Sequence, residues 1–100
     1  MYARMMTVRI DQRKLDDAAH VWRTLVLADH RRRRGFRRAT LVADRASGTV
    51  VITTFWDSQA DSDAQGRDPS RAGLTAQVRL YFDTPAAVQG YEVLAEGVAS

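Results

Sequence analysis

Few side chains in this sequence could carry out nucleophilic, acid–base or metal chemistry. The chain has no cysteine, which excludes disulfide scaffolds, thiolate zinc sites and cysteine nucleophiles. It has two histidines, too few for a histidine-rich metal site. His20 is expected on the solvent side of a helix, and His30 at the C-terminal end of that helix beside an arginine run. No Ser-His-Asp or paired-carboxylate arrangement follows from the spacing, so the sequence indicates no general base.

Length and composition are those of one ordinary globular domain. The chain has 100 residues, of which 45% are hydrophobic and 27% charged, and we treat residues 1–100 as one domain. No apolar run approaches the ~18 residues that a membrane helix needs, and the N-terminus lacks the pattern of a secretory signal. These features predict a cytoplasmic protein that has no membrane partner.

Positive charge is concentrated in the segment from Arg31 to Arg38, which holds six arginines although the net charge is only +3. Such a run could contact nucleic-acid phosphates. Its Arg34-Gly35-Phe36 also matches the start of an RNA-recognition pattern. The match then fails, because arginines follow where a small residue and a stacking aromatic are required. A solvated cluster at a helix end is therefore favoured, and nucleic acid is not an expected partner.

Hydrophobic periodicity predicts a strand followed by a long helix. Residues 2–10 alternate with a period of two, and Asp11 is expected to cap the next element. From Leu15 the period becomes helical, and the helix is expected to end near residues 32–34, before Gly35.

A hairpin and a second α/β stretch follow. Residues 37–43 and 49–56 are expected to pair, and the second of these strands is apolar on both faces. Both sides of the sheet then need cover, and the helices of so small a chain can cover only one. A short helix is predicted to about Gln65, and residues 88–95 as a closing strand. Residues 70–82 fit a helix or a strand equally well by periodicity.

Four groups of residues, taken in order, match a known pattern: Gly35-Phe36 after the first helix, Asp44-Arg45-Ala46-Ser47-Gly48 at the hairpin turn, Trp56-Asp57-Ser58 at the step into the next helix, and Tyr91-Glu92-Val93 near the end. Together they resemble the antibiotic biosynthesis monooxygenase (ABM) family of the dimeric α+β barrel superfamily, across essentially the whole chain. The resemblance favours a helix at residues 70–82. It implies an α+β, ferredoxin-like βαββαβ fold with a four-stranded antiparallel sheet. It also implies a homodimer, a dimeric α+β barrel in which two open sheet faces cover each other.

The resemblance further implies a cofactor-independent monooxygenase that acts on an aromatic or polyketide-like small molecule in a cavity between sheet and helices. No metal or other cofactor is expected, because a deprotonated substrate of this kind can reduce dioxygen directly. The protein would supply an apolar slot and donors aimed at the developing oxyanion. Trp56 is expected to line the slot and offer its N–H, Tyr81 to donate a proton or hydrogen bond, and Arg79 to stabilise an enolate. The expected walls are Met6, Thr54 and Leu74. Packing explains Trp56, Met6, Thr54 and Leu74 equally simply. For Tyr81 a place in the core, and for Arg79 solvation, is the simpler explanation.

Two other functions stay open. The chain could be a non-catalytic small-molecule-binding or stress-related barrel, because a fold persists when its chemistry is lost. Haem degradation, the activity of a second branch of the superfamily, is disfavoured. That branch uses an Asn on the first strand, where Met6 stands here, and an axial His on the second helix, whereas no His follows His30.

Overall fold

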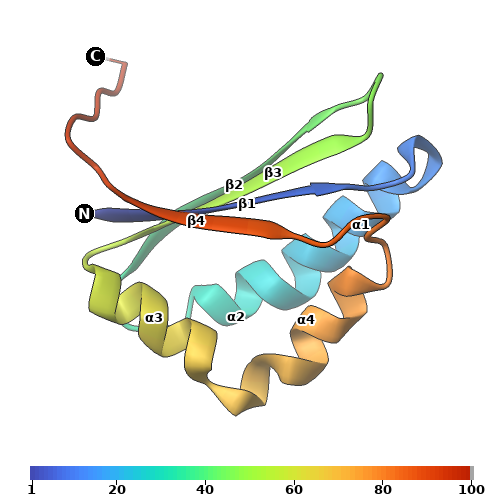
Figure 1. The fold of residues 1–100 in the computed structure, drawn as a ribbon. Helices are drawn as coiled ribbons and strands as arrows, with labels where there is room; N and C mark the ends of the chain where they lie inside the picture. Colours follow the sequence, from blue (N-terminus) through green and yellow to red (C-terminus); the bar gives the residue numbers. More distant parts are fainter. Residues whose placement is uncertain (100) are drawn as a thin grey trace.

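In the computed structural model, which describes residues 1–99, four antiparallel strands form one sheet and the helices pack against one face of it (Figure 1). The elements are β1 (Tyr2–Arg9), η1 (Gln12–Lys14), α1 (Leu15–Val21), η2 (Trp22–Leu27), α2 (Ala28–His30), β2 (Phe36–Asp44), β3 (Thr49–Trp56), α3 (Gln59–Arg67), η3 (Pro69–Arg71), α4 (Ala72–Arg79) and β4 (Ala87–Glu92). The strand order is β2-β3-β1-β4. This arrangement confirms the predicted ferredoxin-like α+β fold. No helix within residues 1–99 has the length and apolar character needed to cross a membrane.

The first long helix is continuous from η1 to α2 and contains a π-helical stretch that the sequence pattern does not predict. It begins as expected, with the Asp11 carboxylate accepting a hydrogen bond of 2.9 Å from the backbone N–H of Arg13. The stretch η2 has π-helical geometry. At 3.6 residues per turn, His30 would lie about 80° away from Trp22 around the helix axis. The π turn rotates less per residue and brings His30 to the buried side. His30 therefore lies at the C-terminal end of the helix, as expected, but its side chain is buried and 3% exposed.

The later elements follow the sequence expectations closely. The strands of the hairpin pair antiparallel around a turn in which Gly48 has φ +78°. Ser58 caps α3 by accepting from the backbone N–H of Asp61 at 3.1 Å. Residues 70–82, which periodicity left open, are mainly helical. The closing strand ends at Glu92, earlier than the predicted residue 95.

The core lies between the inner face of the sheet and the helices. The alternation of β3 places every second side chain in it, and all four of these residues are buried, as their pattern predicts. The core comprises Val8, Ile10, Leu15, Ala18, Trp22, Val26, Val50, Ile52 and Val78. The sheet and the long helix therefore form a rigid base for whatever lies between β1 and α4.

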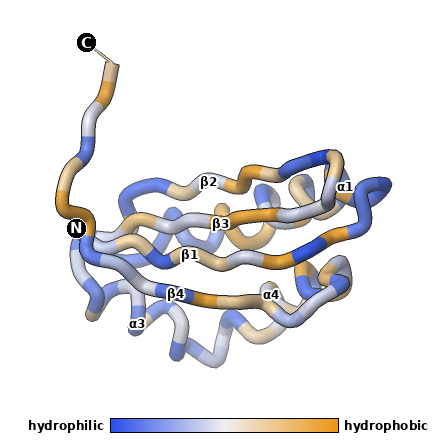
Figure 2. The backbone as a smooth tube through the Cα atoms, turned by 45° about the horizontal axis from the view of Figure 1, so that its top comes forward, coloured by the Kyte–Doolittle hydropathy of each residue, from blue (hydrophilic) through white to orange (hydrophobic). Residues whose placement is uncertain are grey.

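The outer face of the sheet carries no helix among the described residues (Figures 1 and 2). The strand register groups most of its side chains in three rows: Arg38, Phe55, Ala3 and Tyr91; Thr40, Thr53, Met5 and Gln89; Val42, Val51, Thr7 and Ala87. A further row of Asp44, Thr49 and Arg9, next to the hairpin turn, is polar. The Arg38 guanidinium lies 4.1 Å from the centroid of the Phe55 ring. This face is thus apolar in part, with threonines and one stacked arginine among its apolar residues.

Candidate functional site

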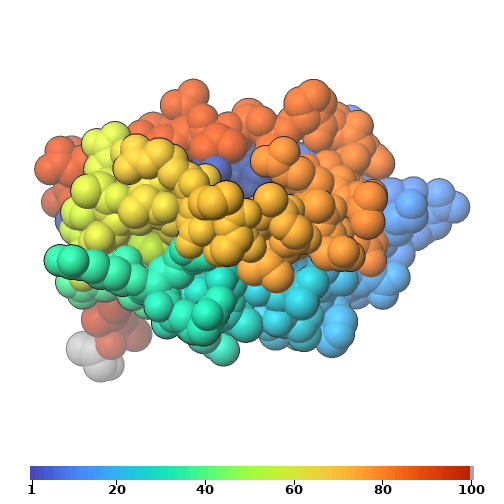
Figure 3. All heavy atoms as spheres, turned by 90° about the horizontal axis from the view of Figure 1, so that it is seen from below, coloured from blue at the N-terminus to red at the C-terminus, as the bar shows by residue number. Residues whose placement is uncertain are grey.

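A cavity of about 690 Å³ lies between the inner face of the sheet and the helices. Its lining comes from β1, β3 and β4, from the long helix, and from residues 66–86. The space-filling view from the helix side shows atoms of β1 through an opening between α3 and α4 (Figure 3). A volume of this size suits a small-molecule ligand of several rings.

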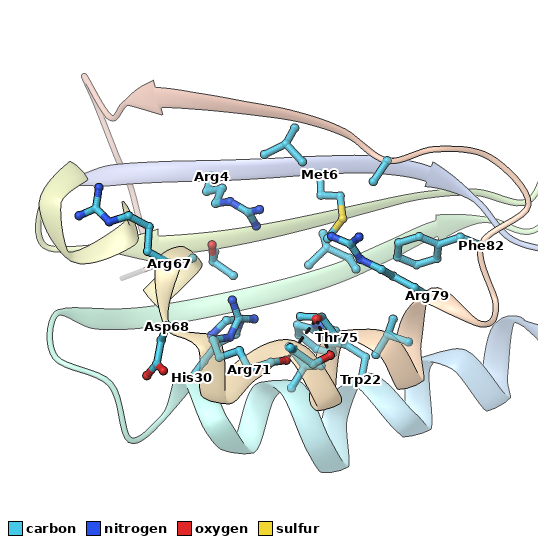
Figure 4. A pocket seen from close by; sticks show the side chains of 18 of the residues that line it. Arg4, Met6, Trp22, His30, Arg67, Asp68, Arg71, Thr75, Arg79 and Phe82 are labelled. Carbon is cyan, nitrogen blue, oxygen red and sulfur yellow. Dashed lines mark hydrogen bonds between the residues drawn. The ribbon is translucent and has the colours of Figure 1, made fainter. Parts of the chain in front are cut away.

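One part of the cavity wall is apolar. Trp22 and Val26, four residues apart on the same side of the long helix, are both buried and line the cavity. Met6 and Phe82 lie on the opposite side and at one end of the cavity (Figure 4). The apolar lining residues are Met6, Trp22, Val26, Ile52, Pro69, Ala72, Val78, Phe82, Pro85, Ala86 and Val88. These side chains can contact the faces and edges of an aromatic ligand.

The rest of the wall is cationic. It contains His30 and four arginines, namely Arg4, Arg67, Arg71 and Arg79 (Figure 4). Within residues 1–99 the side chains of Arg4, Arg67 and Arg79 make no ion pair. Asp68 is the one carboxylate of the described lining, and its Oδ2 is bound by Arg33 Nη1 at 2.5 Å. The cavity therefore carries an excess of positive charge.

The cations of the wall influence one another. Burial lowers the pKa of the Arg4 guanidinium, and the charge of Arg79 lowers it further, against smaller opposing contributions from Asp63 and Tyr2. Burial also lowers the pKa of Arg71, where the charge of Asp29 opposes the shift. Both guanidinium groups remain charged at neutral pH, since their ordinary pKa lies above 12. The field they create favours any negative charge that forms or enters between them.

His30 is a neutral imidazole at the cavity wall. Burial, followed by the charge of Arg71, lowers its pKa to about 4. Its ring stacks on Phe36 and meets the edge of Trp56, with centroid distances of 5.6 Å in both cases. Its Nδ1 has no hydrogen-bond partner among the described residues. The aromatic packing fixes the ring plane, and the free nitrogen leaves one hydrogen-bonding position unfilled.

Trp56 and Thr54 act as a pair on β3. Trp56 is fully buried, outside the lining, and its Nε1–H donates to Thr54 Oγ1 at 2.9 Å. Thr54 lines the cavity. Because its oxygen already accepts the indole N–H, its own hydroxyl hydrogen is available to an acceptor in the cavity.

The structure brings half of the predicted site residues to the cavity. Met6, Thr54 and Arg79 line it. The other three lie outside the lining: Trp56 is behind it, Tyr81 packs partly buried against the core, and Leu74 is half-buried on α4.

Sequence reasoning missed Arg4, Arg71 and His30. Arg4 had a usable signal, because it interrupts the apolar face that β1 turns toward the helices. Arg71 lies in the segment 70–82, whose structure periodicity could not decide. The described residues contain no group of three or more His, Asp or Glu side chains placed to hold a metal ion.

The arginine segment from Arg31 to Arg38 lies outside the cavity, and carboxylates of the same chain match most of its charges. Five of its six arginines lie within ion-pair distance of an acidic side chain: Arg32 and Arg33 pair with Asp29, Arg33 also with Asp68, Arg34 with Asp61, Arg37 with Asp57 and Arg38 with Glu96.

Solved structures share this fold over nearly the whole chain. A monooxygenase of Streptomyces coelicolor (ActVA-Orf6), solved with the ligand nanaomycin D, is similar with a TM-score of 0.84 and 19% identity, covering 99% of this chain and 92% of its own. SnoaB, a cofactor-independent oxygenase of Streptomyces nogalater, gives a TM-score of 0.72 and 16% identity, covering 95% and 92%. Rv0793 of Mycobacterium tuberculosis gives 0.69 and 23%, covering 97% and 98%.

No family model matches the chain, and no curated protein matches it. Identities of this size establish shared architecture and leave the chemistry to the site itself. The resemblance drawn from the sequence is therefore confirmed for the fold: this chain has the α+β fold of antibiotic biosynthesis monooxygenase structures.

Proposed function

We propose that the protein is a cofactor-independent monooxygenase whose substrate is an aromatic, polyketide-like small molecule bound in the cavity between sheet and helices. The observation that carries this proposal is the composition of the cavity, which joins an aromatic and aliphatic wall to unpaired guanidinium groups. Similar structures that are monooxygenases, one of them with bound nanaomycin D, also support it.

The proposed reaction begins with loss of a proton from the substrate. An anthrone, for example, gives a resonance-stabilised anion whose oxygen carries much of the charge. Guanidinium groups close to that oxygen lower the pKa of the substrate and stabilise the anion. The anion is electron-rich and reduces dioxygen. One oxygen atom replaces the two hydrogens of the reacting CH₂ group as a carbonyl, and the other leaves as water with those two hydrogens.

Three lining side chains and Trp56 behind them have a role in this proposal. Arg79 stabilises the enolate oxygen as the catalytic residue, and the Thr54 hydroxyl donates a hydrogen bond to the same substrate. Met6 contacts the ring system. Trp56 is a positioning residue, since its N–H holds Thr54 Oγ1. Tyr81, outside the lining, takes no part.

Oxygen uptake by chelator-treated protein with an anthrone tests the proposal. Arg79→Met is expected to lower kcat about 100-fold, the usual cost of removing one oxyanion donor. Trp56→Phe is expected to lower kcat with little change in KM, because it frees the Thr54 hydroxyl without altering the cavity wall. Arg23→Met, at an exposed position of the long helix, is the matched control and should leave uptake unchanged.

A non-catalytic binding protein is the second candidate. The observation that favours it is the state of Asp68, the one carboxylate of the described lining, which Arg33 engages so that it is not free to act as a base. A ligand-induced rise in thermal stability across a panel of phenols and anthrones, with no oxygen uptake, would select this alternative.

We propose in addition that two copies pair through the outer face of the sheet as a symmetric homodimer. Val42 and Tyr91 on that face are 56% and 50% exposed, and contiguous apolar sheet surface is an aggregation hazard unless it is covered. Sedimentation is expected to give twice the monomer mass of 11.2 kDa. Met5→Glu, in the middle row of the face, should yield monomers, whereas His20→Glu on the long helix should not. A wild-type monomer at micromolar concentration would refute the dimer.

A further inference from the structure

Arg71 holds a buried guanidinium that the protein only partly satisfies. Its residue is 8% exposed. Its Nη1 donates to the backbone oxygen of Gln65 at a long 3.4 Å, and its Nε lies 3.5 Å from Asp29 Oδ2 without forming a hydrogen bond. A buried cation with unfilled donors is costly unless a further acceptor reaches it.

Arg4 presents a second guanidinium to the same end of the cavity. It projects from β1, between Tyr2 and Met6 on the inner face, and makes no ion pair within residues 1–99. In Figure 4 its side chain hangs from β1 above His30 and Arg71, at the end of the cavity opposite Phe82. An unpaired guanidinium on Arg4 and an only partly satisfied one on Arg71 thus lie at the same end of the cavity, where His30 also lines the wall (Figure 4).

The nearby carboxylates are already engaged elsewhere. Asp68 is held by Arg33 and by the backbone N–H of Ser70, and Asp29 is held by Arg32 and Arg33. The positive charge of this end therefore has no counterpart in the lining. A ligand that fits must bring its own negative group.

We propose that the substrate is an aromatic acid whose carboxylate binds between Arg4 and Arg71 while its ring system lies against the apolar wall. A carboxylate has the two-oxygen geometry that a guanidinium fork recognises, which a single phenolate oxygen lacks. Arg79 reaches the cavity beside Met6 and Phe82, and it is the guanidinium assigned to the enolate (Figure 4). Its charge also acts on Arg4, whose pKa it lowers. The inference rests on the proposed function, which supplies the aromatic ring system of the substrate, and it adds a carboxylate group to that substrate.

Equilibrium binding under argon tests the inference without turnover. The probes are anthracene-2-carboxylate and anthracene-2-carboxamide, which share size and shape and differ in charge, with 2-naphthol as a phenol arm. Wild-type protein is expected to bind the carboxylate at least about tenfold more tightly than the carboxamide. A tenfold difference in affinity is about the contribution of one hydrogen bond between charged groups. Arg4→Met should remove that preference and leave carboxamide affinity within twofold. Arg4→Lys, which keeps the charge and loses the fork, should restore part of it.

The matched control is Arg23→Met, which removes an exposed arginine far from the lining and should change neither affinity. Unfolding curves of each variant show whether it is folded at the assay temperature. The inference is overturned if wild-type protein binds the carboxylate and the carboxamide equally well, binds neither of them, or binds 2-naphthol more tightly than the carboxylate. It is also overturned if Arg4→Met weakens the binding of the carboxylate and the carboxamide to the same extent. Carboxylate preference without oxygen uptake would refute the oxygenase proposal alone. Oxygen uptake without that preference would refute the acid group alone.

Discussion

Asp29→Asn is the substitution that tests most sharply how the cavity is held together. Asp29 is 4% exposed near the end of the long helix. Its carboxylate binds Arg33 Nε at 2.9 Å and Arg32 Nη2 at 2.6 Å, and Arg33 continues to Asp68 at 2.5 Å. Arg71 Nε lies 3.5 Å from the same carboxylate. One buried anion thereby ties α2 to η3, the segment that carries Arg71 into the cavity.

Removing this charge leaves buried cations without their counterion. Breaking a buried pair by removing one partner typically costs about 3–5 kcal/mol. Arg33 retains Asp68 in the variant, and the Arg32 side chain is 75% exposed and can return to water. We therefore expect the lower end, about 3 kcal/mol. For a domain of this length that corresponds to a fall in Tm of roughly 12–24 °C.

Thermal unfolding followed by circular dichroism measures this loss, and the chain offers a matched control. Asp16 pairs with Arg45 at 2.8 Å, but the two side chains are 80% and 70% exposed. Asp16→Asn should leave Tm almost unchanged, since exposed pairs contribute little. Equal small shifts in Tm for the two variants would refute the argument that Asp29 anchors η3.

The Asp29 carboxylate should also make the stability of the protein depend on pH. Burial is the largest single influence on the Asp29 pKa and raises it, but hydrogen bonds and charges from Arg33 and Arg32 together outweigh burial, so the pKa is lowered. A carboxylate whose folded pKa is depressed stabilises the protein above its unfolded pKa of about 4. That stability is lost as the pH falls through the folded value. Asp29→Asn should therefore show a shallower loss of stability below pH ~4 than the wild type.

Two further outcomes are expected. The folded pKa of His30, about 4, lies below its unfolded value of 6.5, so the unfolded state binds more protons between these pH values. The free energy of unfolding should therefore increase by up to about 3 kcal/mol as the pH rises from 4 to 6.5. Chemical denaturation at a series of pH values measures this increase, which His30→Phe should abolish; an unchanged increase in the variant would show that another group causes it. Gly35→Ala should lower the free energy of unfolding by about 1–2 kcal/mol or more, because Gly35 has φ +79° and an added Cβ would collide with the Asp61 side chain. Gly66→Ala is the control, since nothing lies within 4 Å of an added Cβ there. Equal unfolding midpoints for the two variants would contradict the expected strain at Gly35.

The fold could be predicted from the sequence because its signals are local. The alternation of residues 2–10 and 49–56, the caps at Asp11 and Ser58 and the hairpin turn each determine one element. Residues 70–82 could not be assigned by periodicity, since the segment satisfies both periods. Only packing against the long helix selects the helix there.

The site was harder to predict from the sequence than the fold, because local sequence patterns do not show which side chains reach the cavity. His30 reaches the cavity through a π turn that no residue of the long helix announces. Trp56 matches its motif, yet its ring lies outside the lining, where it packs against His30 and donates to Thr54 Oγ1. Arg4 was read as one member of an alternating strand. Its importance appears only when α4 places Arg79 and Arg71 around the same space.

The central claim is that this cavity lets dioxygen react directly with an aromatic substrate. Mass spectrometry of the product formed by chelator-treated protein from an anthrone under ¹⁸O₂ tests it most directly. We expect a quinone carrying one atom of ¹⁸O, formed without added metal or flavin and at a rate that falls about 100-fold in Arg79→Met. A quinone whose new oxygen comes from water, or product formation that requires an added metal or flavin, would contradict it.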